Sequence, residues 1–349
     1  MRAGMRLHGA AAARDFTHVA IVAALDRRNG IAQGARLQAA AWPGAALLDG
    51  GHALRHPFWH LPHAPASAYV IHCGAPQTAS LLNAVLPEAR DAWRVGYWAW
   101  ELPDPPPEWK PFADLVHEIW TPSRFAADSL RRMFSRPVRV VPHVVPPHPP
   151  RRRDPSAPFT VLTLADSRSS LSRKNPLGAI EAFRRAFGPS ARARLVVKLA
   201  PGTPPAEVTA ALEGLPNARI IASFLDDDAL AALFRAADVL LSLHRAEGFG
   251  LPMLEAMAHG VPVVATGWSG NVDFMSDADS LLVPSRLVPV VDAAGIYGHS
   301  LWAEPDTDAA AEMLRGLAEF PARHACLAAA AHARAAAHAT AAVRSLAAA

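Results

Sequence analysis

Short apolar runs alternate with longer helix-like stretches along most of the chain, and this alternation constrains the fold more than any other feature. In the first half, the apolar runs fall at residues 18–25, 45–48, 69–72, 95–98, 116–120 and 138–141. Residues 33–41, 78–85 and 124–134 lie between them and favour helices, and Ser123 is a suitable N-cap for the last. Strands joined by crossover helices are typical of a parallel sheet.

The same alternation resumes after residues 142–158, PHVVPPHPPRRRDPSAP, a proline-dense segment with three consecutive arginines that indicates an interdomain linker. The later apolar runs are residues 160–164, 195–199, 219–222, 239–243, 262–265 and 281–283. Two helices between them are predicted by the apolar stripes Leu177, Ile180, Phe183 and Phe187, and Leu230, Leu233 and Phe234. The predicted fold is α/β, with two Rossmann-like, doubly wound domains.

The 349 residues suit two domains at about 150 residues each. We expect one domain at residues 1–150, a second at 151–322, and a helical tail at 323–349. The alanine-rich tail fits a plain packing helix and a helix that bridges the domains equally well. Two doubly wound domains bind ligands at the carboxyl ends of their strands, so functional residues are expected just after apolar runs.

Composition excludes several classes of protein. Lys and Arg total 34 against 31 Asp and Glu, a net charge of +3 that is too weak to indicate nucleic-acid binding. Cys73 and Cys326 match no metal or redox spacing, and no pair of the 16 histidines has convincing ligand spacing, so no metal is expected. The opening segment is broken by Arg14 and Asp15 before it reaches secretory length, and no run of about 18 apolar residues exists. We therefore expect a cytoplasmic protein.

The most informative stretch is HRAEGFGLPMLEAMAHGVPVVAT, residues 244–266, which follows an apolar run and begins a helix near its first proline. Gly248 and Gly250 permit close backbone approach, and the amides of a helix N-terminus favour an anion such as a sugar diphosphate. Glu247 lies in the loop and Glu255 lies in the helix, so both can face the same cleft. Because Glu255 interrupts an apolar helix face, it needs a polar partner, and a ribose diol is suitable.

A second cluster, ADSRSSLSRKNP at residues 165–176, follows the first apolar run of the second domain. Arg173 and Lys174 are placed there to meet phosphate. Lys198 closes the next predicted strand, so its ammonium group can enter the same cleft from a neighbouring strand end. A guanidinium fork and ammonium groups together suit a diphosphate leaving group.

The segment EGFGLPMLE at residues 247–255, followed by AMAHGVPVVA, resembles the donor-site signature of retaining glycosyltransferases of family four, which have the GT-B fold. The motifs RKNP at 173–176, WAEPD at 302–306, GYWAWE at 96–101 and EIWTPS at 118–123 resemble one bacterial branch of that family. The likeness covers about residues 18–320.

The resemblance implies a retaining, metal-independent hexosyltransferase with a nucleotide sugar as co-substrate and no further cofactor. Its catalytic residues would be Glu247, Arg173 and Lys198, the first holding the transferred sugar and the others the diphosphate. The remaining donor-binding residues would be Lys174, Gly248, Phe249, Gly250, Leu251, Glu255 and Asn271, with Lys174 as a substitute phosphate contact and Glu255 on the ribose. In such enzymes the leaving phosphate is thought to deprotonate the incoming hydroxyl, so no protein nucleophile is assigned.

The first domain would hold the acceptor, a saccharide or a lipid-linked sugar, in bacterial surface polysaccharide assembly. Residues 29–36 resemble the family's glycine loop but lack the usual adjacent glycine pair. The acceptor-lining residues would be Gly30, Gly34, His72, Trp98 and Glu101. Ordinary core packing explains the tryptophan equally well. A lipid-linked acceptor would bring the protein to the inner face of the membrane.

Two alternatives remain open at this stage. The first is a non-catalytic GT-B subunit that binds a nucleotide sugar or a partner enzyme. The second is a dehydrogenase with a nucleotide cofactor, since Rossmann-like domains alone do not fix function. A dehydrogenase needs a glycine fingerprint followed about 20 residues later by an acidic residue, and although Asp49 is suitable, the spacing between Gly30 and Gly34 is wrong.

Overall fold

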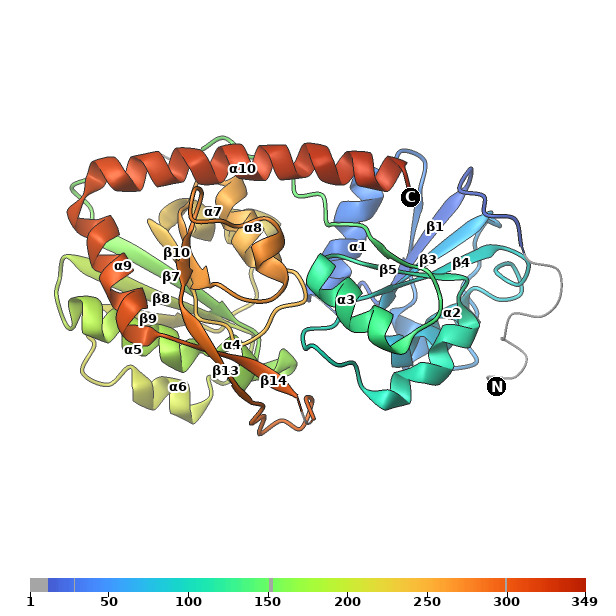
Figure 1. The fold of residues 1–349 in the computed structure, drawn as a ribbon, viewed down its shortest axis with the longest axis horizontal. Helices are drawn as coiled ribbons and strands as arrows, with labels where there is room; N and C mark the ends of the chain where they lie inside the picture. Colours follow the sequence, from blue (N-terminus) through green and yellow to red (C-terminus); the bar gives the residue numbers. More distant parts are fainter. Residues whose placement is uncertain (1–11, 28, 151–152, 299) are drawn as a thin grey trace. The chain divides into compact units, whose positions relative to one another are not determined.

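The computed structural model describes residues 12–349 except residues 28, 151–152 and 299. The opening segment up to residue 11 and part of the arginine run in the expected linker lie outside the described residues. The chain divides into two compact units. The first comprises Met1–Val144 together with Thr340–Ala349, and the second comprises Val145–Ala339. Each unit is a parallel sheet with helices on both faces, as the sequence predicts (Figure 1).

The first unit contains a six-stranded sheet in the order β2-β1-β3-β4-β5-β6, with every neighbouring pair parallel. Its strands are β1 (Val19–Ala23), β2 (Ala46–Asp49), β3 (Ala68–Cys73), β4 (Trp93–Trp98), β5 (Glu118–Thr121) and β6 (Val138–Val140). Its helices are α1 (Gly30–Ala41), α2 (Thr78–Ala84) and α3 (Arg124–Met133), with 3-10 turns η2 (Gly51–Leu54), η3 (Ala75–Gln77) and η4 (Pro107–Leu115). The predicted cap of α3 is confirmed, because Ser123 Oγ accepts a hydrogen bond from the Ala126 amide.

The second unit contains another six-stranded sheet, in the order β12-β11-β10-β7-β8-β9, again parallel throughout. Its strands are β7 (Phe159–Ala165), β8 (Ala193–Leu199), β9 (Ala218–Ile221), β10 (Val239–Ser242), β11 (Val263–Thr266) and β12 (Leu281–Val283). This order is that of a Rossmann domain, in which the chain reverses its direction of travel between the first and fourth strands. Here that switch point lies between β7 and β10.

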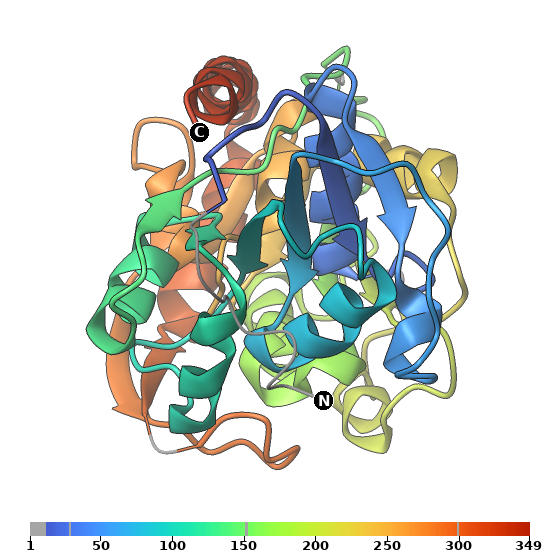
Figure 2. The same cartoon turned by 90° about the vertical axis from the view of Figure 1, so that its right-hand side faces the viewer.

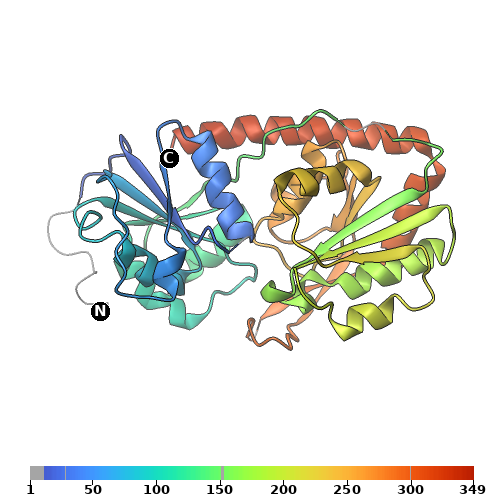
Figure 3. The same ribbon diagram turned by 180° about the vertical axis from the view of Figure 1, so that it is seen from behind.

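Helices cover both faces of the second sheet, as seen from behind in Figure 3. They are η5 (Ser167–Ser169), α4 (Leu171–Lys174), α5 (Pro176–Phe187), α6 (Ala206–Ala211), α7 (Asp227–Ala236), α8 (Leu251–Ala258), η6 (Gly270–Asp273) and α9 (Thr307–Glu319). Apolar residues of β7 and β8 share one core cluster with Ile180 and Phe183 of α5 and Leu314 of α9. Leu177 was expected in the α5 stripe but is 39% exposed, so the buried stripe begins one turn later.

Several elements were not predicted from the sequence. The helices α6 and α9 were missed, as was an antiparallel hairpin formed by β13 (Ser285–Pro289) and β14 (Leu301–Pro305). The hairpin includes most of the WAEPD motif. Strand β13 is largely exposed, so the sequence has no buried apolar run that would predict the hairpin.

The expected helical tail is a single helix, α10 (Pro321–Ala347), seen end-on in Figure 2. Leu327, near its start, packs against the core of the second unit. Leu346, near its end, packs with Val19, Tyr97 and Trp120 in the core of the first unit. Within the described residues, no helix is both long and apolar enough to cross a membrane.

The segment expected as a glycine loop, residues 29–36, is instead the start of α1, because the Asn29 side chain caps the helix at Ala32 and helical backbone begins at Gly30. Gly34 therefore serves packing. A Cβ atom at Gly34 would lie 2.4 Å from Cε1 of His143, which is buried and stacked on Tyr97.

We expect Gly34→Ala to destabilise the first unit by about 1–3 kcal/mol, because the added methyl group overpacks against a confined imidazole ring. The matched control is Gly30→Ala in the same helix, where a new Cβ meets nothing within 4 Å. Urea unfolding of both variants measures the difference, and equal stability of the two variants would contradict the packing role of Gly34.

Two stacked histidines attach the linker to the second unit. The rings of His148 and His259 are 4.0 Å apart and nearly parallel, and the His148 amide donates to Ala258 O. His332 of α10 contacts the carbonyl of His148. His259 is buried, and burial lowers its pKa to about 4, helped by the positive fields of His148, Arg235 and His332.

A buried histidine of this kind makes the second unit sensitive to acid. The pKa of His259 is near 6.5 when the chain is unfolded and lower in the fold, so its neutral form supports the fold above pH 6.5 and that support is lost as pH falls towards 4. We expect wild-type protein to lose about 1–2 kcal/mol more than His259→Phe between pH 7.5 and pH 5 in urea unfolding. Phenylalanine keeps a flat ring on His148, and an identical loss in both proteins would refute the assignment.

Candidate functional site

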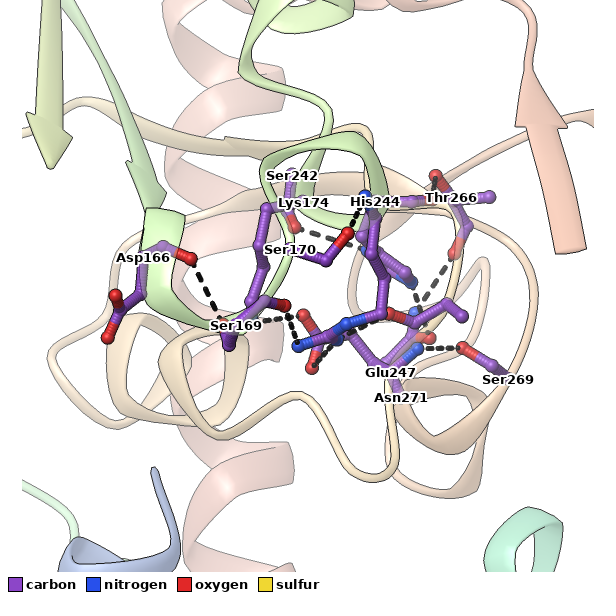
Figure 4. Close-up of polar contacts among 12 residues, drawn as sticks. Asp166, Ser169, Ser170, Lys174, Ser242, His244, Glu247, Thr266, Ser269 and Asn271 are labelled. Carbon is purple, nitrogen blue, oxygen red and sulfur yellow. Dashed lines mark hydrogen bonds and ion pairs between the residues drawn. The ribbon is translucent and has the colours of Figure 1, made fainter. Parts of the chain in front are cut away.

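The candidate site lies at the switch point of the second sheet, where the segments after β7 and β10 diverge (Figure 4). Doubly wound sheets bind ligands at this position, because the loops that leave neighbouring strands in opposite directions open a crevice. After β7 come η5, α4 and Asn175. After β10 come a loop from Leu243 to Gly250 and then α8. Both sequence motifs that predicted a donor site are therefore brought together.

A single turn, residues 170–175, presents the two cations of the first motif, and we call it the cation turn. Ser170 caps α4 through its side chain, which accepts from the Arg173 amide at 3.2 Å. Asn175 adopts a left-handed conformation, ends α4 and caps α5 by accepting from the Gly178 amide. The side-chain amide nitrogen of Asn175 also donates to Leu243 O at 2.9 Å. The turn is thus fastened to the segment that follows β10.

A buried carboxylate, Glu247, meets both cations. Lys174 Nζ donates to Glu247 Oε1, and an Arg173 guanidinium nitrogen lies 3.4 Å from Oε2. Glu247 is 7% exposed and Arg173 is 3% exposed. Burial alone would raise the pKa of Glu247, but the charges of Lys174 and Arg173 outweigh it and lower the pKa to about 2. The carboxylate is therefore ionised at any physiological pH.

The two cations of the turn have different freedom. The Arg173 guanidinium also donates to Ala246 O at 2.8 Å and Ser169 O at 3.3 Å, so it faces inward. The Lys174 side chain is 16% exposed and borders, with Glu247 and Ser242, a small cavity of about 10 Å³. The sequence placed Arg173 first and Lys174 as its substitute, whereas the geometry leaves Lys174 the more accessible of the two.

The loop before α8 is built for close backbone contact. Gly250 has φ of +97°, a conformation that residues with side chains rarely adopt, and it is the N-cap residue directly before α8. Gly270 passes so close to Gly248 that a Cβ there would lie 2.3 Å from the Gly248 carbonyl oxygen. The Glu247 amide donates to Ser269 Oγ at 2.9 Å. Phe249 turns its ring inward onto Phe274, so only its backbone is suited to a ligand role.

Asn271, which was predicted to bind the sugar donor, instead holds this loop together through its side chain. Its side chain is fully buried, donates to Thr266 O at 3.0 Å and meets His244 Nε2 at 3.1 Å. Thr266 Oγ1 in turn donates to His244 O at 2.6 Å. These contacts join the ends of β10 and β11 and occupy the polar atoms of Asn271.

Glu255 lies one turn inside α8 and is half-buried. Burial raises its pKa to about 8, and the negative charge of Asp227 in α7 adds to the effect. In the part of the chain that the structure describes, no ion pair or hydrogen bond to the Glu255 carboxyl group is found. A half-buried carboxyl group of this kind is suited to accept hydrogen bonds from a ligand hydroxyl pair.

Lys198 stands at the end of β8, as predicted, and is half-buried with its Nζ donating to Leu199 O. Burial lowers its pKa, partly offset by Asp166. Asp166, after the neighbouring β7, accepts a two-pronged contact from Arg168 at 2.9 and 2.8 Å. Arg168 was not among the site residues predicted from the sequence. Its place at the same sheet edge adds an exposed cation to the site.

The predicted acceptor residues lie in the first unit and are mostly buried. Trp98 is fully buried, and its indole nitrogen donates to Thr78 Oγ1, so its ring packs in the core, the alternative left open above. His72 is 1% exposed and contacts Gln38 at 2.6 Å. Gly30 and Gly34 are helical, and Glu101 is half-buried after β4.

Comparison with known proteins adds to this geometry. The family described as Glycosyl transferases group 1 matches residues 169–296, a segment that includes the cation turn, Glu247 and Glu255. The structure of HepE from Anabaena, in complex with UDP-glucose, is similar over 95% of this chain and 98% of its own, with a TM-score of 0.68 and 14% identity. The fold is that of GT-B glycosyltransferases.

Two further structures have the same GT-B fold. WaaG, a glycosyltransferase involved in lipopolysaccharide biosynthesis, matches with a TM-score of 0.53 and 15% identity, covering 91% of this chain and 95% of WaaG. TarM, from S. aureus, matches with a TM-score of 0.59 and 13% identity over 77% of this chain. The chain spans about half the length of TarM, at 51%. No curated protein matched the sequence.

Among the residues that the structure describes, no three His, Cys, Asp or Glu side chains gather in a way that could hold a metal ion. The polar groups at the switch point are mainly cations and backbone amides, a donor set for anions.

Replacing Glu255 should change thermal stability and nucleotide binding in opposite directions. Because its pKa is near 8 in the fold and near 4.3 when unfolded, ionising it costs stability increasingly as pH rises through this interval. We expect Glu255→Gln to raise the melting temperature of the ligand-free protein at pH 8 by about 2–4 °C, and to weaken nucleotide binding. Scanning calorimetry with and without nucleotide checks both, and a variant with unchanged melting and unchanged binding would rule out a ligand role for Glu255.

Proposed function

We propose that this protein is a retaining glycosyltransferase that moves a hexose from a nucleotide-sugar donor to a saccharide or glycolipid acceptor in bacterial surface polysaccharide assembly. The observation that carries the proposal is the buried Glu247, held by Lys174 and Arg173 directly before the N-terminus of α8. A carboxylate, two cations and a helix N-terminus at one switch point fit a sugar joined to a diphosphate.

The cations would stabilise the leaving diphosphate. Lys174 can turn from Glu247 towards a phosphate oxygen, since its side chain is partly exposed and the carboxylate would keep Arg173 as a partner. Lys198 would contact the same group from the next strand end, with Arg168 beside it. Positive groups fixed before the reaction stabilise the charge that develops on the departing phosphate.

The carboxylates would hold the two sugars of the donor. Glu255, with its raised pKa and half-buried carboxyl group, is suited to the ribose hydroxyls. Glu247 and the first backbone amides of α8, near Leu251, would hold the transferred hexose, because the first amides of any helix have no partner within the helix. Gly248 and Gly250 would let the hexose approach the backbone closely.

The reaction would proceed on one face of the sugar. The bond between the anomeric carbon and the diphosphate oxygen breaks, the acceptor oxygen bonds to the same carbon, and the acceptor proton passes to the departing phosphate oxygen. Atoms and charge balance without a protein nucleophile. The first unit, in this proposal, binds the acceptor, and a cytoplasmic site at the inner face of the membrane would give access to lipid-linked sugars.

The solved neighbours support this choice of substrates. HepE was crystallised with UDP-glucose, and also with UDP and glucose. WaaG is described as a glycosyltransferase of lipopolysaccharide biosynthesis. The dehydrogenase alternative loses support, because Gly30 and Gly34 lie within α1 and form no strand-to-helix glycine turn.

Nucleotide binding is the first test. We expect one donor from a panel of UDP-glucose, UDP-N-acetylglucosamine and GDP-mannose to raise the melting temperature by about 5 °C at a hundredfold excess over its dissociation constant. The shift should vanish in Lys174→Met and Arg173→Ala. It should persist in Arg194→Met, which removes an exposed cation on β8 away from the site.

Release of free nucleotide from the bound donor, followed with candidate acceptors, then tests transfer. Melting that no donor changes would contradict the proposal. A donor that binds but is never consumed, with any acceptor, would identify the non-catalytic GT-B subunit instead.

A further inference from the structure

The β13–β14 hairpin lies outside the Rossmann-like sheet of the second unit, and a two-stranded ribbon has little stability alone. Its outer strand is mostly exposed, with Leu287 at 51%. The contacts that fix it are therefore informative. Several of them reach the cation turn and the segment after β10.

Asp292, in the loop of the hairpin, is the first of these contacts. Its Oδ1 accepts a hydrogen bond from Ser170 Oγ at 2.7 Å, and its Oδ2 accepts from the Ile296 and Tyr297 amides at 2.8 and 3.2 Å. One carboxylate thus closes the hairpin loop and holds the residue that caps the cation turn. The pKa of Asp292 is lowered: burial acts against this, but the hydrogen bonds from Ser170 and the loop amides prevail, so it stays ionised.

The hydrogen bond matters because Ser170 is conformationally strained. Ser170 has φ of +72°, a region costly for residues other than glycine, and it is fully buried. Its hydroxyl oxygen also accepts a hydrogen bond from the Arg173 backbone amide. A strained residue keeps its conformation only when its surroundings fix it, and Asp292 supplies one of the two side-chain contacts seen here.

A ring and a second carboxylate complete the attachment. Tyr297 is buried and lies under the Arg173 guanidinium, whose carbon is 5.8 Å from the ring centre. On β14, Glu304 binds Arg245 through two contacts of 2.7 and 3.1 Å. Arg245 in turn donates to Ser172 O at 2.6 Å, and its amide donates to Arg173 O at 2.7 Å.

We propose that the β13–β14 hairpin is a positioning element for the cation turn, with Asp292 and Glu304 as positioning residues that keep Arg173 and Lys174 aligned for the diphosphate. Neither carboxylate touches the substrate in this scheme. Asp292 acts through Ser170, and Glu304 acts through Arg245. The catalytic consequence rests on the proposed function, whereas the mechanical link does not.

The mechanical link is tested without any ligand. Hydrogen–deuterium exchange of residues 170–175 should be about tenfold faster in Asp292→Ala than in wild type, while exchange in β7 stays unchanged. The control is Glu312→Ala, which removes an exposed carboxylate from α9 of the same unit. Unaltered exchange of the cation turn in Asp292→Ala would overturn the proposal.

A double-mutant cycle identifies the route. Ser170→Ala and Asp292→Ala should show strong coupling, with the double variant exchanging no faster than the more affected single variant. If the two substitutions accelerate exchange independently, so that their rate factors multiply in the double variant, the link through Ser170 is overturned. Circular dichroism and melting curves show whether each variant remains folded.

The catalytic consequence is tested by steady-state kinetics with the nucleotide sugar that raises the melting temperature. We expect Asp292→Ala and Glu304→Gln to lower kcat for that donor about tenfold with KM changed less than twofold, since misplaced cations lose charge stabilisation mainly in the transition state. Glu312→Ala should match wild type. A folded Asp292→Ala enzyme with wild-type kcat would overturn the positioning role, whereas wild-type protein that turns over no donor would refute the proposed function and leave the exchange result to judge the hairpin.

Discussion

The second unit is organised around one buried ion cluster, in which Glu247 meets Lys174 and Arg173. Removing such charges from water costs free energy, and they are tolerated here because Glu247 has two cationic partners and Arg173 also donates to two backbone carbonyl groups. The cluster joins the segment after β7 to the segment after β10, two strands that are neighbours in the sheet but lie far apart in the sequence. It therefore fixes the spacing of the crevice at the switch point.

Under the proposed function, Glu247 takes the place beside Lys174 that a donor phosphate would take. A carboxylate occupies cations that a phosphate could otherwise bind, so the lysine side chain is held in an ordered position before a donor arrives. An anion that enters must compete with Glu247 for Lys174. The free-energy cost of this exchange is small, because Arg173 still neutralises the Glu247 carboxylate when Lys174 moves away.

Strand alternation was enough to predict both sheets, since every predicted strand is present in the correct unit. The buried parallel strands are nearly continuous apolar runs, and such runs are readable without tertiary information. The β13–β14 hairpin was missed because Leu287 and its neighbours are exposed and the pairing partner is distant in sequence. Helix α6 has only six residues, too few to show a helical period.

The site was predictable where a motif fixes the local backbone. The glycines and the first proline of residues 244–266 indicate a helix start by local chemistry, so α8 was placed correctly after a strand end. The segment with Arg173 and Lys174 was likewise placed correctly after the first apolar run of the second domain. Contacts across the fold were not predictable. The sequence could not show that Arg173 would face inward, that Asn271 would contact His244, or that Asp292 would reach Ser170, because each of these contacts joins residues more than 20 positions apart. Nor could the sequence choose between acceptor lining and core packing for Trp98, since both roles suit an aromatic residue at the end of a strand.

Helix α10 makes the first unit discontinuous in sequence, because Thr340–Ala349 belongs with Met1–Val144. Leu346 packs into a core whose other residues come mainly from β1, β3, β4 and β5. A recombinant fragment that stops at residue 144 would therefore present an apolar hollow to water. The second unit is continuous and has its own core, so the two halves of this chain differ in how readily each can be isolated, exchanged with a relative's or fused to another protein.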